Sequence, residues 1–248
     1  MRVRTAVLIA ALLLMTPLAA DAQEPEGWWF EIFPTTWTVG IEGTFRVDGQ
    51  EADFDKSAGD LIDYVDFGGG LLGSVNYNRW CLRAQFDYMS LSTDALEVEY
   101  RPQGGEFDSD MLFSEAAVGY WLGSLRKGGS NYVFAGLRSL HTESDLEVHG
   151  VGTYSRENDL LDPMVGVQGS YPIFPSKIRG LRIVAMMTIG GGGDSKLIYG
   201  LQPALQYQFT ENVVVRVGYR RLAWQVERDD DEMDFSLAGL IAGLGVRF

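Results

Sequence analysis

The chain has 248 residues, and its 34 acidic against 20 basic residues give a formal net charge of −14. Such an acidic chain lacks the basic footprint that nucleic-acid binding needs, and this excludes DNA- and RNA-binding classes. The sequence contains one cysteine, Cys81, so it cannot form an internal disulfide. It also contains 30 Gly, 6 Trp, 11 Tyr and 13 Phe, a composition that favours many strands and turns.

The N-terminal segment has the organisation of a secretory signal peptide. Two arginines precede an apolar run at 6–14, and an Ala-x-Ala motif ends at Ala22. This pattern predicts a signal peptide (1–22) and a single mature domain (23–248). The alternative is an anchoring helix, but the run is short for a span of about 20 residues.

The mature region alternates apolar and polar residues with a period of two, which is the pattern of β-strands. Turn residues interrupt this alternation and divide it into ten strands. We expect these strands at 28–47, 67–77, 80–100, 107–122, 131–147, 157–171, 181–189, 197–209, from 213 to the acidic run 229–232, and from there to 248.

The connections between the expected strands alternate in length. Those after strands two, six and eight are short or proline-rich, whereas those after strands one, three and five are long and charged. Short turns at one end and long loops at the other are typical of a bacterial outer-membrane barrel with periplasmic termini. The sequence therefore predicts a closed, antiparallel, up-and-down transmembrane β-barrel of ten strands, with eight or twelve as alternatives. Several strands exceed the roughly 9–11 residues that cross a bilayer, and these should project on the loop side.

The first long connection contains a helix signal. Ser57 and Asp60 have the spacing of a capping box, and Leu61, Ile62 and Val65 follow at helical spacing. We expect a short helix at 57–66, packed on the rim or partly in the barrel mouth. A lid over a ligand site is the alternative interpretation.

Aromatic residues recur beside the short turns. They are expected to form a periplasmic aromatic girdle of the kind that outer-membrane barrels carry. The residues are Trp28, Trp29, Tyr77, Trp80, Tyr120, Trp121, Tyr171, Tyr207, Phe209 and Phe248.

The alternation also assigns polar residues to the lumen, where a charge must be paired or hydrated. The expected lumen network comprises Glu42, Arg83, Asp87, Glu115, Arg138, Asp162, Arg216 and Arg220. Arg138 and Arg220 share a Gly-x-Arg-x-Leu context, and we expect them to pair with Glu115, Asp162 or Asp87. Barrels of about eight strands are filled by side chains, whereas 16 to 18 strands leave a channel. Ten strands favour a plugged or narrow lumen over a polar conduit.

Several stretches resemble a group of uncharacterised Gram-negative outer-membrane β-barrel proteins. The N-terminal half of that family is similar to Pro34–Gly43 and Asp60–Phe67, and its C-terminal half to Gly136–Leu140, Asp162–Gly166 and Gly218–Leu222. The resemblance implies the barrel fold and the outer-membrane location, and it assigns no activity. We expect a structural or porin-like role, with outer-membrane lipid and lipopolysaccharide as partners. We also expect the barrel-assembly machinery, which in such families reads a terminal aromatic, to recognise Phe248.

One pair of residues raises an enzymatic alternative. Ser139 and His141 are two residues apart and share the lipid-side face, where Glu143 could orient the histidine of an outer-membrane lipid hydrolase. His149 near two acids is weaker support for an omptin-like protease, because no paired aspartates lie on facing strands. We expect no enzyme, cofactor or metal site, and the acidic run 229–232 is interpreted as solvated. A surface receptor that uses the long loops is a further alternative.

Overall fold

The computed structural model describes residues 26–47, 50–56, 65–96, 105–124, 128–148, 152–178, 180–228 and 231–248. The expected signal peptide (1–22) and most of the expected helix (57–64) lie outside the described residues. The last two residues of that expected helix, Val65 and Asp66, belong to a strand.

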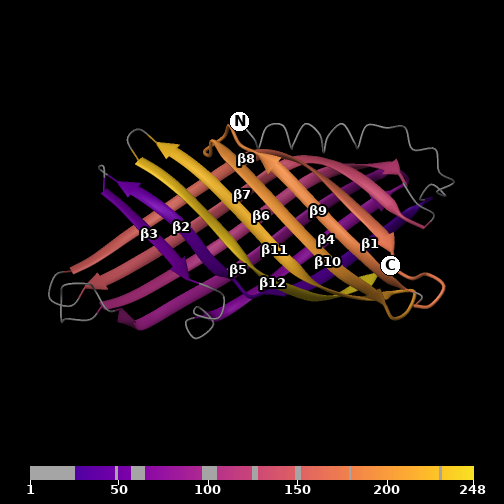
Figure 1. The fold of residues 1–248 in the computed structure, drawn as a ribbon, viewed down its shortest axis with the longest axis horizontal. Helices are drawn as coiled ribbons and strands as arrows, with labels where there is room; N and C mark the ends of the chain where they lie inside the picture. The colour runs from indigo at the N-terminus through magenta and orange to yellow at the C-terminus, as the bar shows by residue number, and fades with distance from the viewer. Residues whose placement is uncertain are drawn as a thin grey trace.

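The described residues form twelve β-strands that run steeply across the molecule (Figure 1). Their bounds are β1 (Trp28–Trp37), β2 (Gly40–Val47), β3 (Gln50–Lys56), β4 (Val65–Tyr77), β5 (Trp80–Leu96), β6 (Gly105–Gly123), β7 (Ser130–Val148), β8 (Gly152–Pro172), β9 (Leu181–Gly190), β10 (Leu197–Gln208), β11 (Val213–Arg228) and β12 (Asp231–Arg247). Among these residues, no helix is long and apolar enough to cross a membrane.

The sheet closes because the first and last wall strands pair. Its order is β1-β4-β5-β6-β7-β8-β9-β10-β11-β12-β2-β3, and β1 also pairs with β12. β12 pairs with β1 as far as Trp37↔Ile241 and continues along β2 from Gly40↔Ala238. β1 and β2 therefore act as one wall strand interrupted at 38–39. Counted in this way, the wall has ten antiparallel strands, which confirms the predicted closed barrel.

The wall is taller on one side than the sequence predicts. The long connection expected after the fifth strand is replaced by strand, since β7 runs to Val148 and β8 begins at Gly152. The expected first long connection likewise contains β3, which forms a hairpin with β2. β6, β7 and β8 have 19, 19 and 21 residues, well beyond the length that crosses a bilayer.

The outer face of the wall is an apolar belt. Aliphatic and aromatic side chains that alternate with buried neighbours are each about half exposed on it. They include Leu82 57%, Phe86 51%, Val118 50%, Leu137 51%, Leu161 51%, Val165 52%, Met187 51%, Leu205 52%, Val217 53% and Leu240 62%. A soluble protein does not leave a continuous apolar surface of this extent in water, so the belt is a lipid-facing surface.

Aromatic side chains gather at the end where the short turns lie, as predicted. Trp28 packs on Tyr77 with ring centroids 4.5 Å apart, and Trp80 packs on Tyr120 at 5.0 Å. Trp121, also expected in this girdle, is buried instead, because its parity on β6 points inward.

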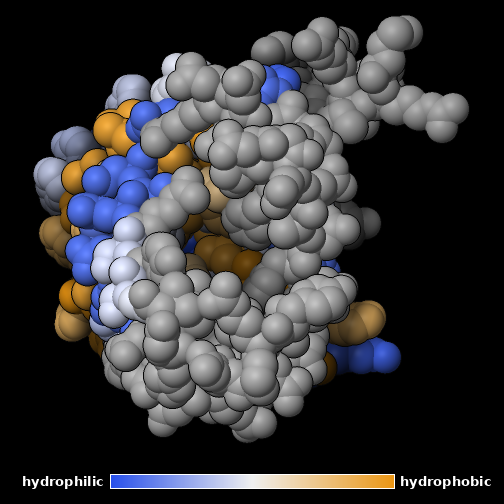
Figure 2. Space-filling view, turned by 90° about the vertical axis from the view of Figure 1, so that its left-hand side faces the viewer, coloured by the Kyte–Doolittle hydropathy of each residue, from blue (hydrophilic) through white to orange (hydrophobic). Residues whose placement is uncertain are grey.

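The interior is filled in two layers. Towards the end with the β2–β3 hairpin, an apolar layer includes Trp37, Phe113, Trp224, Leu237 and Ile241. Figure 2 looks onto this end, where hydrophobic residues are visible towards the centre. Trp224 meets Phe113 edge to face at 6.4 Å across the lumen, since β11 and β6 are not neighbours in the sheet. Below lies a layer of buried charges.

Candidate functional site: the charged interior and an outer histidine cluster

The buried charges form one continuous network that crosses the lumen. Its core is Glu115 on β6, a fully buried carboxylate whose Oε2 accepts a bond from Arg138 Nη2 at 2.9 Å. Arg83 Nε lies 3.8 Å from the other oxygen of Glu115. Two arginines therefore share one acid, as a buried charge requires a partner.

From this core the network extends to strands on the far side of the barrel. Arg83 on β5 donates to Gln168 on β8 at 3.1 Å and to Gln85 beside it at 3.1 Å. Gln85 in turn donates to Asp87 at 2.9 Å. The Oδ2 atom of Asp87 accepts a 2.6 Å bond from Arg220 on β11. The bonds from Arg83 to Gln168 and from Arg220 to Asp87 join strands that are not neighbours in the sheet, so they bridge the lumen itself.

Arg220 links the charged layer to the apolar layer. Its guanidinium carbon lies 4.6 Å from the ring centre of Trp37 and 4.4 Å from that of Phe113. A guanidinium stacked on aromatic faces gains cation–π attraction, most when it is shielded from water. Arg220 is only 1% exposed, so its guanidinium is shielded from water where the two layers meet.

Two glycines make room for the network. A Cβ on Gly70 would lie 2.1 Å from Asp87 Oδ1, and a Cβ on Gly200 would lie 2.5 Å from Thr188 Oγ1. Thr188 accepts a 2.7 Å bond from Arg138. Gly70, in the glycine-rich stretch of β4, is thus explained by the charged side chain that it faces.

Nearer the termini, a second group of charges lies inside the wall. Glu31 on β1 binds Arg247 at 2.8 Å and Arg216 at 3.5 Å. Arg216 also donates to Gln206 at 2.8 Å and stacks over Phe33 at 4.5 Å. Sequence reasoning missed Glu31 because it assigned the even positions of this strand to the lumen.

Asp162 lies in the interior but serves a turn. Its Oδ1 accepts bonds from the backbone N–H groups of Gly193 at 3.2 Å and Ser195 at 2.8 Å. This holds the turn after β9 against β8, which explains why that connection does not project like the others.

The prediction for Glu42 was wrong. Its side chain is 56% exposed and binds the outer residue Arg221 at 3.2 Å. Its neighbour Ile41 packs against the interior apolar cluster, so the parity of β2 is opposite to the one expected. Apolar residues line the mouth of the barrel on the inside, and the alternation alone does not distinguish that face from the lipid face.

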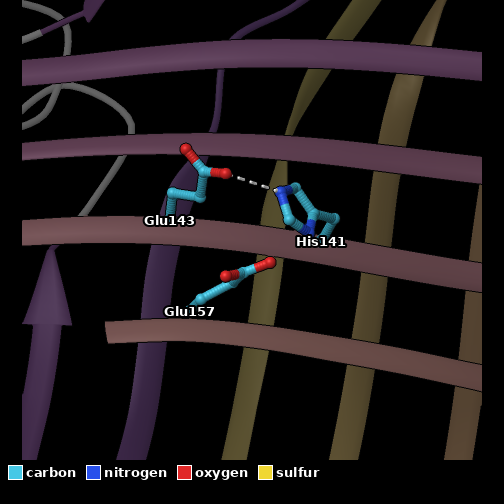
Figure 3. A group of neighbouring side chains, drawn as sticks. All are labelled: His141, Glu143 and Glu157. Atoms are coloured by element: carbon cyan, nitrogen blue, oxygen red, sulfur yellow. Dashed lines mark hydrogen bonds and ion pairs between the residues drawn. The ribbon is translucent and has the colours of Figure 1, made fainter. Parts of the chain in front are cut away.

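On the outer face, His141 sits among carboxylates from two strands (Figure 3). Its Nδ1 lies 2.7 Å from Asp159 on β8, and its Nε2 lies 3.3 Å from Glu143 on β7. The apolar belt on these strands ends at Leu137 and Leu161, so the cluster lies beyond the membrane-spanning part of the wall. The hydrogen bonds to Asp159 and Glu143 raise the pKa of His141 from its ordinary value.

The contacts of His141 differ from those that the alternative interpretation, a lipid hydrolase at Ser139 and His141, requires. Both ring nitrogens of His141 contact carboxylates, whereas a Ser–His pair needs one nitrogen at the serine hydroxyl. Ser139 is on the same strand face, opposite Leu161 of β8. His149, the weaker omptin-like candidate, lies outside the described residues.

Phe248 is 67% exposed at the end of the wall. Its backbone N–H donates to Phe30 O at 2.9 Å, and Phe30 N–H donates to Phe248 O at 3.1 Å. The last residue thus completes the β1–β12 pairing that closes the barrel.

The closed ten-strand wall, the apolar belt and the filled polar interior define a transmembrane β-barrel of the outer-membrane type. No family model matches the sequence, and no curated protein matches it. Solved structures do match over most of their length. The outer-membrane protease OmpT of Escherichia coli has a TM-score of 0.50 at 11% identity and covers 94% of this chain and 100% of its own. The likeness to OmpT shows the fold.

Two further barrels have lower scores. The translocator domain of the autotransporter NalP from Neisseria meningitidis has a TM-score of 0.49 at 11% identity, covering 100% of this chain and 98% of its own. The attachment invasion locus protein Ail of Yersinia pestis has a TM-score of 0.39 at 15% identity, covering 90% and 100%.

Proposed function

We propose that the protein is an integral outer-membrane barrel with a plugged lumen, and that it displays the tall β5–β8 wall at the cell surface. The observation that supports this proposal is the lumen-crossing network with the plane of Arg220, Trp37 and Phe113 above it. The cavities beside this plane have volumes of about 20 Å³ and about 10 Å³. Each has room for about one water molecule, far less than a conducting pore needs.

The partners of such a barrel are lipid and lipopolysaccharide around the apolar belt. The barrel-assembly machinery acts on the C-terminal strand that ends in Phe248. A barrel in this location resists alkaline extraction from outer-membrane fractions, and when folded it migrates differently on gels before and after heating. Recovery of the unheated protein in the soluble fraction would contradict the membrane location.

Conductance of the purified protein in planar lipid bilayers tests the plug. We expect no ohmic steps from the wild-type chain. The double variant Asp87→Asn/Arg220→Gln removes the cross-lumen ion pair and is expected to conduct intermittently. Glu42→Gln/Arg221→Gln, which removes the matched pair on the outer face, is the control and should remain silent. Stable, porin-like steps from the wild-type protein would overturn the proposal.

We also propose that the Ser139/His141 pair is not a hydrolase site, since both imidazole nitrogens of His141 are occupied by carboxylates. Phospholipid turnover by the purified protein should be at the detergent background and should not change in Ser139→Ala. Turnover that this substitution abolishes would restore the hydrolase.

A second candidate function is a surface receptor. The observation that favours it is the apolar layer inside the end of the barrel that carries the β2–β3 hairpin. A receptor would bind an apolar ligand there. Saturable quenching of tryptophan fluorescence by hydrophobic probes, lost in Trp224→Phe, would support a ligand site there. The absence of saturable quenching would exclude it.

A further inference from the structure

The register of β7 and β8 places two glutamates opposite each other, and a histidine opposite an aspartate, outside the membrane belt. Glu143 pairs directly with Glu157, and His141 pairs directly with Asp159. Two carboxylates directly opposite on neighbouring strands repel each other. The imidazole of His141 lies beside them on the same face, in a position to join whatever cation relieves that repulsion (Figure 3).

A neutral His141 side chain cannot satisfy both of its contacts with carboxylates. A neutral imidazole carries one N–H, so it can donate to one carboxylate only. Yet Nδ1 lies 2.7 Å from Asp159 and Nε2 lies 3.3 Å from Glu143. In either neutral tautomer one nitrogen lone pair faces a carboxylate oxygen, and a second proton on the ring or a metal ion at that nitrogen would relieve this contact.

The spacing of the ligand atoms fits a metal ion. One ligand atom from each of His141, Glu143 and Glu157 lies within 4.8 Å of the other two. Zinc bonds of about 2.0–2.1 Å in a tetrahedron set neighbouring ligand atoms about 3.4 Å apart. The 3.3 Å contact between Nε2 and Glu143 already has this separation. Glu157 is exposed, so a rotamer change can bring its carboxylate to the same distance.

Asp159 has the position of an orienting residue. Histidines that bind metals usually donate their other N–H to a carboxylate, which fixes the tautomer and the ring direction. The 2.7 Å contact from Nδ1 to Asp159 supplies this interaction and leaves Nε2 for the ion. Asp110 on β6 pairs with Glu143 from the other side and adds to the negative field that attracts a cation.

We propose that His141, Glu143 and Glu157 bind a Zn²⁺ ion on the outer face of the β7–β8 hairpin, with Asp159 as the positioning residue. Imidazole nitrogen favours zinc and its transition-metal neighbours, whereas Ca²⁺ and Mg²⁺ prefer oxygen ligands alone. Three protein ligands leave the fourth position of the ion to water. The site joins the two strands above the bilayer and is independent of the interior plug.

The test is zinc titration of the full chain, expressed into the outer membrane and purified in detergent, by isothermal calorimetry. We expect one Zn²⁺ per barrel at micromolar affinity, and binding of Ca²⁺ and Mg²⁺ that is at least tenfold weaker. His141→Ala and Glu157→Gln should each weaken zinc binding at least tenfold. Asp159→Asn should weaken it about tenfold, as loss of an orienting carboxylate does elsewhere.

Two matched controls keep the test specific. Asp145→Asn removes an exposed acid two residues from Glu143 on the same face, and His149→Ala removes the other histidine of the chain; neither should alter zinc affinity. The heat-dependent gel shift confirms that each variant is folded. Replacement of zinc by Co²⁺ should give visible d–d absorption bands that His141→Ala abolishes.

Zinc binding that is absent at millimolar concentration would overturn the proposal. So would binding that Asp145→Asn weakens as much as Glu157→Gln does, because that result would indicate a diffuse acidic surface. Equal affinity for Ca²⁺ and Zn²⁺ would likewise contradict a role for the imidazole.

Discussion

Inside the barrel, Arg83, Arg138 and Arg220 meet two acids, Glu115 and Asp87. On the outer face of β7 and β8, one histidine meets three acids. The interior charges are buried, and one of their ion pairs, Asp87 with Arg220, joins strands that are not neighbours in the sheet, whereas the outer charges lie at the surface and belong to one hairpin. The comparison teaches that burial and topology, and not residue type, decide whether a charged cluster holds the fold or is available to a ligand.

Among changes to the interior network, Glu115→Gln is expected to cause the largest loss of stability. It leaves Arg138 and Arg83 without a full charge partner in a buried site, which typically costs about 3–5 kcal/mol. The urea midpoint of the heat-dependent gel shift measures the loss of unfolding free energy. Glu42→Gln breaks an exposed pair with Arg221 and should cost at most about 1 kcal/mol. Equal losses of unfolding free energy would show that the interior network stabilises the fold no more than an exposed ion pair does.

A second prediction concerns the space that the network needs. Gly70→Ala places a methyl group 2.1 Å from Asp87 Oδ1 and 2.6 Å from the Phe86 carbonyl oxygen, so the side chain or the backbone must shift. Overpacking of this kind usually costs about 1–3 kcal/mol. Gly73→Ala, on the same strand with no atom within 4 Å, is the control and should leave the unfolding midpoint unchanged or slightly raised.

On the outer face, removal of an acidic residue is expected to raise stability instead of lowering it. In zinc-free buffer, Glu157→Gln removes a repulsion with Glu143 and should stabilise the hairpin by about 0.2–1 kcal/mol. Hydrogen exchange of the β7–β8 amides measures this local change. A loss of protection would mean that Glu157 has a favourable partner in the metal-free protein.

The smallest effect is a pH dependence. The bonds to Asp159 and then to Glu143 raise the pKa of His141 from 6.5. A raised pKa means that protonated His141 stabilises the hairpin fully below the unfolded pKa, and that this stabilisation is lost as the pH rises through the folded value. The chain has two histidines, so His149→Ala leaves one imidazole to follow by NMR. An NMR titration midpoint of His141 below that of the unfolded chain would contradict the contacts with Asp159 and Glu143.

Much of the fold was predictable because several strands alternate cleanly. On β5 the expected inward residues Arg83, Gln85 and Asp87 are buried, and Leu82 and Phe86 are exposed as expected. The parity of β1 and β2 was not predictable. Phe30 and Ile32 are exposed while Phe33 and Trp37 are buried, so both faces are apolar near the mouth and the girdle. Where the interior is itself hydrophobic, a period of two does not show which face meets lipid.

The outer cluster shows a different limit. The spacing of His141 and Glu143 on one strand was visible in the sequence, but their partners Glu157 and Asp159 come from the next strand through its register. A shift of one residue would have turned these acids to the other face of the sheet. The structure continues β7 to Val148 and begins β8 at Gly152, whereas the sequence suggested a longer connection between them.

The β2–β3 hairpin has a consequence for how copies of this barrel coexist in a crowded membrane. Within the described residues, β3 stands at the end of the sheet order, with β2 as its neighbour, so one edge offers its backbone to other chains. An open edge of this kind invites strand-to-strand aggregation. The seven residues of β3, Gln-Glu-Ala-Asp-Phe-Asp-Lys, include four charged ones. Charged residues on an edge strand are one of the devices by which proteins limit such pairing.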